Sequence, residues 1–293
     1  MHQPDADLSL MHSALSTGCG CAGAHGSRRG FLQTLIASGA LAASAPVLAQ
    51  VDVGKSSTMR NLVPAETLEQ AAEQQYAELL AQAKQQGALA QPGNAQLQRL
   101  QAIAQRLIPQ ALVWNERAKG WKWEVNLIGS QQINAFCMPG GKIVFYTGLI
   151  DKLQLSDDEI AMVMGHEMAH ALREHSREQL AKTQATSLGI RLGAAIFGLG
   201  DMGTAAANLG GKLLTLKFSR SDETDADLVG LELAARAGYN PQAAVTLWQK
   251  MGEANGSGGI GFLSTHPTGP NRIANLQANV PKVERLYEQA RKR

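Results

Sequence analysis

The stretch SDDEIAMVMGHEMAHAL, at positions 156–172, has the signals of a helix start followed by a mostly apolar helix. Ser156 is a preferred N-cap residue, and Glu159 stands three positions later, where it completes a capping box. Acidic residues in the first turn also interact favourably with the helix dipole. We therefore predict a helix that starts at Ser156 and runs to about Leu180, with its apolar positions facing a core.

The same helix contains the pattern H-E-x-x-H, formed by His166, Glu167 and His170. Two histidines four residues apart are separated by about 400° around a helix, so they share a face and can bind one ion. Glu167 lies about 100° from His166 and reaches beside the ion, where it can act as a base toward an activated water. The pattern predicts one zinc ion per chain in a hydrolase, against the alternative of two surface histidines on an ordinary helix.

A catalytic zinc site needs a third protein ligand and one open position. His175 is five residues past His170, about 500° around the helix, so we expect it to point outward, away from the face that the pair shares. His266 is distant in sequence and precedes a proline. Glu223 opens a predicted helix on which Asp227 shares its face, so one can bind zinc while the other accepts a hydrogen bond from a ligand histidine. A solvated acidic helix start is the alternative, and spacing alone leaves it open.

The first 49 residues have the features of an export signal. Arg28 and Arg29 precede an apolar run rich in small residues, and V-L-A at 47–49 fits a signal peptidase site. The arginine pair, in the setting S-R-R-G-F-L, resembles a twin-arginine (Tat) signal. We expect cleavage after Ala49 and export to a bacterial periplasm. An uncleaved membrane anchor is the alternative, but the run is shorter than the roughly 20 residues that a spanning helix needs.

The remaining sequence predicts one α+β domain that is mostly α-helical. Residues 50–62 are expected to be a flexible lead-in, and 63–293 the domain, with N-terminal helices at 63–118 and a catalytic core at 119–280. Alternating or apolar runs at 123–127, 133–137 and 143–146, with the turn P-G-G at 139–141, predict a small antiparallel sheet packed on the H-E-x-x-H helix. Further helices are predicted at 64–87, at 97–112 with Pro109 bending or ending it early, from 221, and at 271–280.

Composition argues against several classes of function. The formal net charge is +2 with 18% charged residues and no basic stripe, so we expect no nucleic-acid binding. Of the three cysteines only Cys137 follows the signal, and we expect it to be a buried filler instead of a ligand. No apolar run of the domain is long enough to span a bilayer, so at most peripheral membrane contact is expected.

Taken together, the motifs resemble the gluzincin zinc metallopeptidases of the family that includes HtpX, BepA, LoiP and the CAAX prenyl proteases. H-E-x-x-H at 166–170 is followed by E-x-x-x-D at 223–227; N-A-F at 134–136 and P-G-G at 139–141 precede it, and T-H-P at 265–267 with Arg272 comes last. The resemblance covers about residues 95–280. It implies a zincin-like metallopeptidase fold, Glu223 as the third zinc ligand, and Asp227 as the hydrogen-bond partner of a ligand histidine.

The resemblance also implies a substrate cleft. Asn134, Ala135 and Phe136 are expected to lie along it, where an extended substrate can add as a strand. For His266 it favours a place at the zinc site, either stabilising the oxyanion or covering the open position; a turn histidine is the alternative. Arg272 is expected to support His266 or to bind substrate backbone, with a structural salt bridge as the alternative.

These expectations combine into a zinc-dependent endopeptidase of the periplasm with polypeptide substrates. From the resemblance alone, we expect it to degrade misfolded exported or outer-membrane proteins, with outer-membrane proteins or their assembly machinery as partners. The alternative from another class is a zinc-stabilised chaperone or binding module with little proteolytic activity. Glu167 argues against that alternative, because a purely structural zinc site has no use for this carboxylate.

Overall fold

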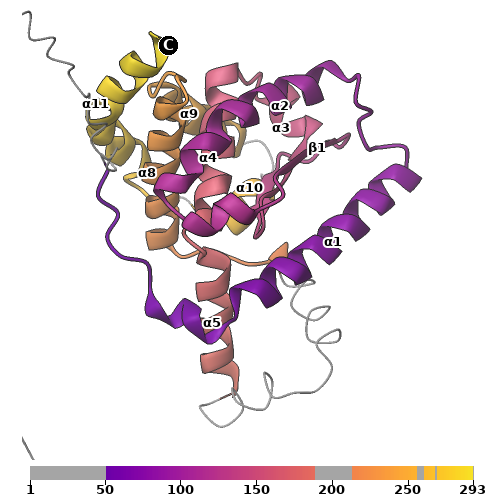
Figure 1. The fold of residues 1–293 in the computed structure, drawn as a ribbon. Coiled ribbons are helices and arrows are strands. Elements are labelled where there is room, and N and C mark those ends of the chain that lie inside the picture. Colours follow the sequence, from indigo (N-terminus) through magenta and orange to yellow (C-terminus); the bar gives the residue numbers. More distant parts are fainter. Residues whose placement is uncertain (1–50, 189–212, 256–260, 268, 293) are drawn as a thin grey trace, which may run out of the picture. The chain divides into compact units, whose positions relative to one another are not determined.

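The computed structural model describes residues 51–188, 213–255, 261–267 and 269–292, and the expected signal at 1–49 lies outside them (Figure 1). The described part is mostly helical, with one three-stranded sheet. The helices, with short 3-10 helices written η, are η1 (Thr58–Leu62), α1 (Ala65–Gln85), α2 (Ala95–Leu107), η2 (Ile108–Val113), η3 (Glu116–Gly120), α3 (Thr147–Lys152), α4 (Asp157–Leu172), α5 (His175–Leu188), α8 (Arg220–Arg236), α9 (Ala243–Asn255), α10 (Gly261–Thr265) and α11 (Arg272–Arg291). The strands are β1 (Glu124–Ile128), β2 (Ala135–Met138) and β3 (Lys142–Tyr146).

Helix α4 lies at the centre of the domain and starts as the sequence predicts. The Ser156 side chain accepts from the backbone N–H of Glu159, and the Glu159 carboxylate accepts from the N–H of Ser156, which completes the capping box. Every residue of α4 from Glu159 to Leu172 is buried. Burial on all sides of a helix is typical of an element enclosed by others, and α4 packs against α8, α2, α9 and the strand β2.

A pair of glycines lets α4 and α8 approach closely. A Cβ atom on Gly230 of α8 would lie 2.6 Å from the backbone nitrogen of His166, and a Cβ on Gly165 of α4 would lie 2.8 Å from the carbonyl oxygen of Gly230. Both distances are too short for non-bonded atoms, so the two backbones can touch here only because both residues lack a side chain. This contact fixes α8 beside the face of α4 that carries His166.

The sheet is mixed, which corrects the expectation of an antiparallel sheet. β2 and β3 form the expected hairpin, with Gly140 and Gly141 at φ +84° and +80° in its turn. β3 occupies the middle of the order β1-β3-β2, and β1 pairs with it in parallel. The connection from β1 to β2 crosses the end of β3, where the N–H of Gly148 donates to the carbonyl of Ser130. β3 therefore lies between β1 and β2. The alternation of residues within each strand could not reveal that β1 pairs with β3.

The helix that contains the H-E-x-x-H pattern is shorter than predicted. It ends at Leu172 instead of continuing to about Leu180, because Glu174 adopts a left-handed backbone with φ +60°. A new helix, α5, begins at His175. No glycine or proline marks this break, so the usual stop signals did not reveal it.

Two other regions have features that the sequence did not indicate. Within the expected lead-in at 50–62, Val51 is buried and its N–H donates to the Glu232 carboxylate at 2.9 Å. Helix α11 extends past its expected end at 280 and through Pro281, because the buried residues Val283 and Leu286 continue its apolar stripe. Among the described residues, no helix combines the length and the apolar character needed to cross a membrane.

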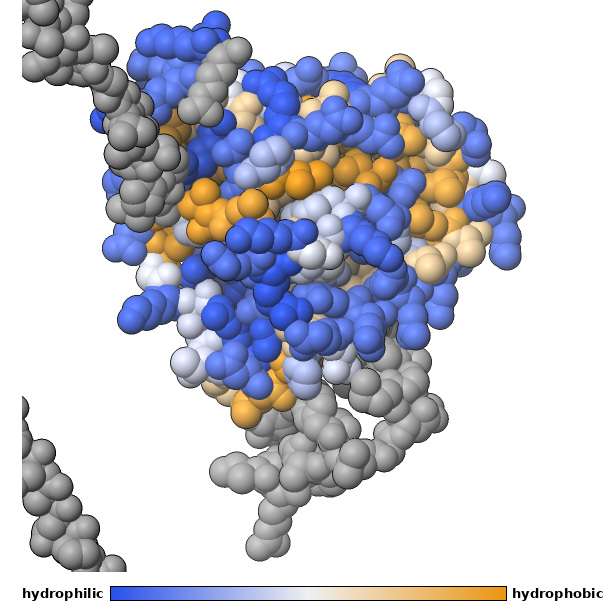
Figure 2. All heavy atoms as spheres, in the orientation of Figure 1, coloured by the Kyte–Doolittle hydropathy of each residue, from blue (hydrophilic) through white to orange (hydrophobic). Residues whose placement is uncertain are grey.

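The surface of the described part is mainly polar. Its exposed large hydrophobic side chains are Leu62, Leu112 and Val113. Figure 2 shows one face of the molecule, largely hydrophilic with a hydrophobic band across it.

Candidate metal centre

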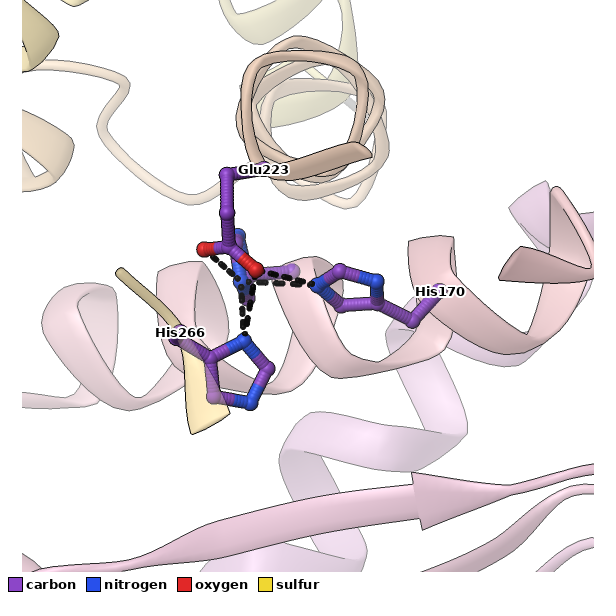
Figure 3. A group of neighbouring side chains, drawn as sticks. His170, Glu223 and His266 are labelled. Carbon is purple, nitrogen blue, oxygen red and sulfur yellow. Dashed lines mark hydrogen bonds and ion pairs between the residues drawn. The ribbon is translucent and has the colours of Figure 1, made fainter. Parts of the chain in front are cut away.

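Four buried side chains converge on one point beside α4 (Figure 3). His166 and His170 present their Nε2 atoms 3.1 Å apart, as the four-residue spacing predicts. Glu223 of α8 places carboxylate oxygens 3.5 Å from His166 Nε2 and 3.4 Å from His170 Nε2. His266 places its Nδ1 atom 3.3 Å from His166 Nε2 and 3.0 Å from a Glu223 oxygen. The four candidate ligand atoms all lie within 4.8 Å of one another.

Local structure explains how Glu223 reaches this point. Ser219 caps α8 and forms a capping box with Asp222, so the helix begins slightly before the expected Ser221. Glu223 therefore lies in the first turn, directly after the cap. Because the glycine contact places α8 against α4, this first turn faces the histidine pair.

Asp227 and Arg272 support the cluster from the side of α8 and α11. The Asp227 carboxylate lies 3.0 Å from His166 Nδ1, the ring nitrogen that faces away from the other ligand atoms. Arg272 donates to Asp227 at 2.6 Å and to Glu223 at 3.0 Å, and its guanidinium lies 3.2 Å from the centre of the Trp248 ring. Arg272 thus orients both carboxylates. These contacts are salt bridges of the kind considered as the alternative for Arg272, and the residue is not among those that line the cleft described below.

Glu167 lies beside the cluster without joining it. It is buried, and its Oε1 atom has no hydrogen-bond partner in the described structure. The same atom lies 3.6 Å from Nε2 of His266. Burial raises the pKa of Glu167. A buried carboxylate oxygen without a hydrogen bond is costly, so a hydrogen-bond donor such as a water beside Oε1 would be stabilising.

A cleft opens directly onto Glu167 and His170. One wall is the edge strand β2 with the residues before it, and Asn134, Ala135 and Phe136 are among its lining residues. The buried Oδ1 of Asn134 has no hydrogen-bond partner in the described structure. The other lining residues are Cys137, Met138, Pro139, Ser176, Leu213, Leu214, Leu216, Phe218, Thr265 and His266. Cys137 is buried as expected, and burial raises the pKa of its thiol well above the ordinary value.

The charges at the centre favour a cation. Burial alone would raise the pKa of Glu223, but hydrogen bonds with three histidines lower it well below its ordinary value. Burial opposes the charged form of His166, yet Asp227 and Glu223 raise its pKa to about 9. Burial lowers the pKa of His170 well below its ordinary value. Buried carboxylates are stable only when paired, so a divalent ion among these donors would replace the proton that His166 otherwise keeps.

His175 was expected to point outward, and that expectation is wrong. It is buried, with its Nδ1 atom 2.9 Å from Nδ1 of His170 and its Nε2 atom 3.3 Å from an Asp225 oxygen. The cause is the left-handed residue Glu174, which ends α4 and turns His175 back toward the site. The angle of 500° applied only to an unbroken helix, and the sequence around Glu174 contains no recognised signal for the break.

Comparison with known proteins agrees with this geometry. A model of peptidase family M48 matches residues 94–280. The chain is 39% identical to the mitochondrial metalloendopeptidase OMA1 of Schizosaccharomyces pombe over 166 residues, which are 56% of this chain and 48% of that protein. It is 28% identical to the metalloprotease LoiP of Escherichia coli over 178 residues, 59% of this chain and 69% of LoiP. It is 27% identical to the beta-barrel assembly-enhancing protease of Yersinia pestis over 177 residues, 57% of this chain and 36% of that protein.

The chain therefore spans about half the length, or less, of the OMA1 and assembly-enhancing relatives. The matched range 94–280 contains all four residues of the cluster and also Glu167, Asp227 and Arg272. The resemblance to gluzincin metallopeptidases is confirmed: the chain belongs to peptidase family M48.

Proposed function

We propose that this protein is a zinc-dependent endopeptidase in which His166, His170 and Glu223 bind one zinc ion and Glu167 is the base. The observation that carries the proposal is the spacing of the ligand atoms. Ligands about 2.0–2.2 Å from a tetrahedral zinc ion lie about 3.3–3.6 Å from each other. The direct contacts within the cluster, at 3.0–3.5 Å, are close to this range, and all four candidate ligand atoms lie within 4.8 Å of one another, which supports a single ion among them.

Glu167 is suited to move the protons of hydrolysis. When bound, the zinc ion would polarise the scissile carbonyl and activate the attacking water. Oε1 of Glu167 then takes a proton from that water and delivers it to the nitrogen of the departing amine. Its raised pKa brings the carboxyl closer to neutrality, where a group can both accept and release a proton efficiently. Burial also excludes bulk water from this transfer.

His266 occupies the position that a substrate carbonyl or the attacking water would need. Its Nδ1 atom belongs to the cluster, 3.3 Å from Nε2 of His166, and its Nε2 atom faces Glu167 at 3.6 Å. Of the two roles considered for His266, this arrangement supports the cover over the open position, which corresponds to a resting form. Hydrolysis then requires the His266 ring to move away, after which the same ring is near enough to stabilise an oxyanion.

The substrate that fits the cleft is an extended polypeptide. β2 lies at the edge of the sheet, and the cleft runs along Asn134, Ala135 and Phe136 next to Glu167. A peptide that adds to this edge as a further strand would pass its backbone across the metal. The buried amide oxygen of Asn134 has no hydrogen-bond partner in the described structure, which leaves an unused acceptor beside this path.

Location and physiological role rest on other evidence. The arginine pair at 28–29 supports export to a bacterial periplasm through the Tat pathway. A relative named for enhancing beta-barrel assembly supports misfolded outer-membrane proteins as substrates, whereas the relatives named OMA1 are mitochondrial. Replacing Arg28 and Arg29 by lysine keeps the charge but should leave the precursor in the cytoplasm. Normal periplasmic accumulation of that variant, measured by cell fractionation, would exclude the Tat route.

The enzyme and the chaperone alternatives separate in one assay. Purified protein is incubated with casein alone, with a chelator, and with a chelator followed by added zinc. We expect cleavage in the first and third samples, and none from Glu167→Gln, which should still bind about one zinc per chain. Absence of zinc-dependent cleavage, or substantial cleavage by Glu167→Gln, would contradict the proposal.

A further inference from the structure

The two ligand histidines of α4 have different partners on their outer ring nitrogens. His166 faces the Asp227 carboxylate, a familiar arrangement for a metal-binding imidazole. His170 instead faces a second imidazole, that of His175, at 2.9 Å between their Nδ1 atoms. Both rings of this pair are buried. An imidazole beside a ligand imidazole restricts where protons can be, because one nitrogen must donate and the other must accept.

With a metal ion bound to Nε2 of His170, the contacts permit one proton arrangement. Nε2 of His170 belongs to the metal cluster and must present a lone pair, so the proton of His170 is on Nδ1 and is donated to His175. Nδ1 of His175 is then the acceptor, and its own proton is on Nε2, which faces Asp225 at 3.3 Å. Arg173 donates to the same Asp225 oxygen at 2.8 Å and to the carbonyl of Gly54 at 2.9 Å. These bonds form a continuous chain from Arg173 to the ligand nitrogen of His170.

The ring of His170 is also fixed from its face. Phe218 stacks on it with ring centres 3.9 Å apart and an angle of 24° between the planes. Stacking limits tilting of the ring but does not select which nitrogen carries the proton or how the ring turns within its plane. Of the described contacts of the outer nitrogen of His170, Nδ1, the bond to His175 is the one that does both.

We propose that His175 and Asp225 are positioning residues, which fix the tautomer and the orientation of His170 for metal binding. The proposal rests on the proposed function, since it requires that the cluster bind zinc. It assigns a role to a histidine and to a carboxylate that do not themselves reach the metal. Loss of such a partner typically weakens metal affinity by about 10–100-fold.

Two substitutions at one position test the proposal. In His175→Asn the amide oxygen stands where Nδ1 stands now and can still accept from His170, whereas His175→Leu offers no acceptor. We measure the zinc dissociation constant by competition with a chelator, and the free energy of unfolding of each metal-free protein. His175→Leu should raise the dissociation constant about 10–100-fold, and His175→Asn should recover most of the affinity at similar stability. Equal affinities for wild type and His175→Leu, or equal losses in both variants, would overturn the proposal.

A second measurement uses the unmodified protein and so does not depend on how the variants fold. With ¹⁵N-labelled histidine and bound zinc, NMR should show a proton on Nδ1 of His170 coupled across the hydrogen bond to Nδ1 of His175. A proton on Nδ1 of His175 would overturn the inference while leaving the proposed function intact. If the wild type does not bind stoichiometric zinc, the proposed function fails first and the inference fails with it.

Discussion

Substitution of Gly230 by alanine should impair zinc binding without changing any ligand. The new Cβ would lie 2.6 Å from the nitrogen of His166 and 2.8 Å from the carbonyl carbon of Gly165, and both of these are backbone atoms that cannot rotate away. Ordinary contact would require α4 and α8 to separate by about 1 Å. Overpacking of this kind costs about 1–3 kcal/mol, while the better helix propensity of alanine returns up to about 1 kcal/mol.

The same separation acts on the metal centre, because α8 carries Glu223 and Asp227 whereas α4 carries the histidines. Metal–ligand distances in well-formed sites lie within about 0.2 Å of their standard values. We therefore expect Gly230→Ala to raise the zinc dissociation constant by at least about tenfold, comparable to losing a supporting hydrogen bond. Its free energy of unfolding, measured in the metal-free protein with urea, should fall by up to about 2 kcal/mol.

Gly252 provides a matched control. It lies in helix α9, and a Cβ atom added there would meet nothing within 4 Å. Gly252→Ala should therefore leave zinc affinity unchanged and stabilise the protein slightly, by up to about 1 kcal/mol. The reasoning is refuted if Gly230→Ala behaves like Gly252→Ala in both measurements.

Four further substitutions probe the candidate metal centre and the stability of α4. Glu223→Ala should lose zinc and activity together, whereas Asp227→Ala should weaken zinc affinity by about 10–100-fold. If metal analysis finds equal zinc content in wild type and Glu223→Ala, another residue is the ligand. His266→Ala should raise turnover of small peptides if the ring covers the open position, or lower it by roughly 10²–10³-fold if the oxyanion role dominates, and an unchanged rate on peptide and protein substrates would reject both roles. Burial would raise the pKa of Glu159, but hydrogen bonds from Lys250 and from the helix cap lower it below its ordinary value of 4.5. The ionised carboxylate therefore stabilises the folded state above pH 4.5, and this stabilisation is lost as pH falls through the lowered pKa. Glu159→Gln should thus be less stable than wild type in urea unfolding at pH 7, with a difference that shrinks below pH 4.5, and a difference independent of pH would contradict this account.

Local signals in the sequence predicted the part of the site that lies on one helix. The capping box at Ser156 and the spacing of His166 and His170 depend only on residues a few positions apart, so they could be read directly. Glu167 followed from the same geometry. The end of α2 before Pro109 and the glycine turn between β2 and β3 were equally local, and both are confirmed.

The sequence alone left the third ligand open between a solvated helix start and a metal ligand. Resemblance suggested Glu223, but its position beside the histidines depends on two glycines 65 positions apart in the chain, Gly165 and Gly230, that allow α4 and α8 to touch. No periodicity within either helix encodes that contact. The parallel pairing of β1 with β3 was hidden for a similar reason, because it depends on how the connection between β1 and β2 crosses the sheet.

The amino-acid sequence by itself determined the H-E-x-x-H helix, its start and the pair of histidines on one of its faces. Only the tertiary structure decided where that helix ends, and with it the position of His175. The left-handed backbone at Glu174 has no local signature, and it persists because the folded domain surrounds it: Arg60 and Arg177 bind the Glu174 carboxylate, and His175 is enclosed next to His170. Short-range patterns predict elements; the contacts between distant elements set their ends and bring the candidate ligands together.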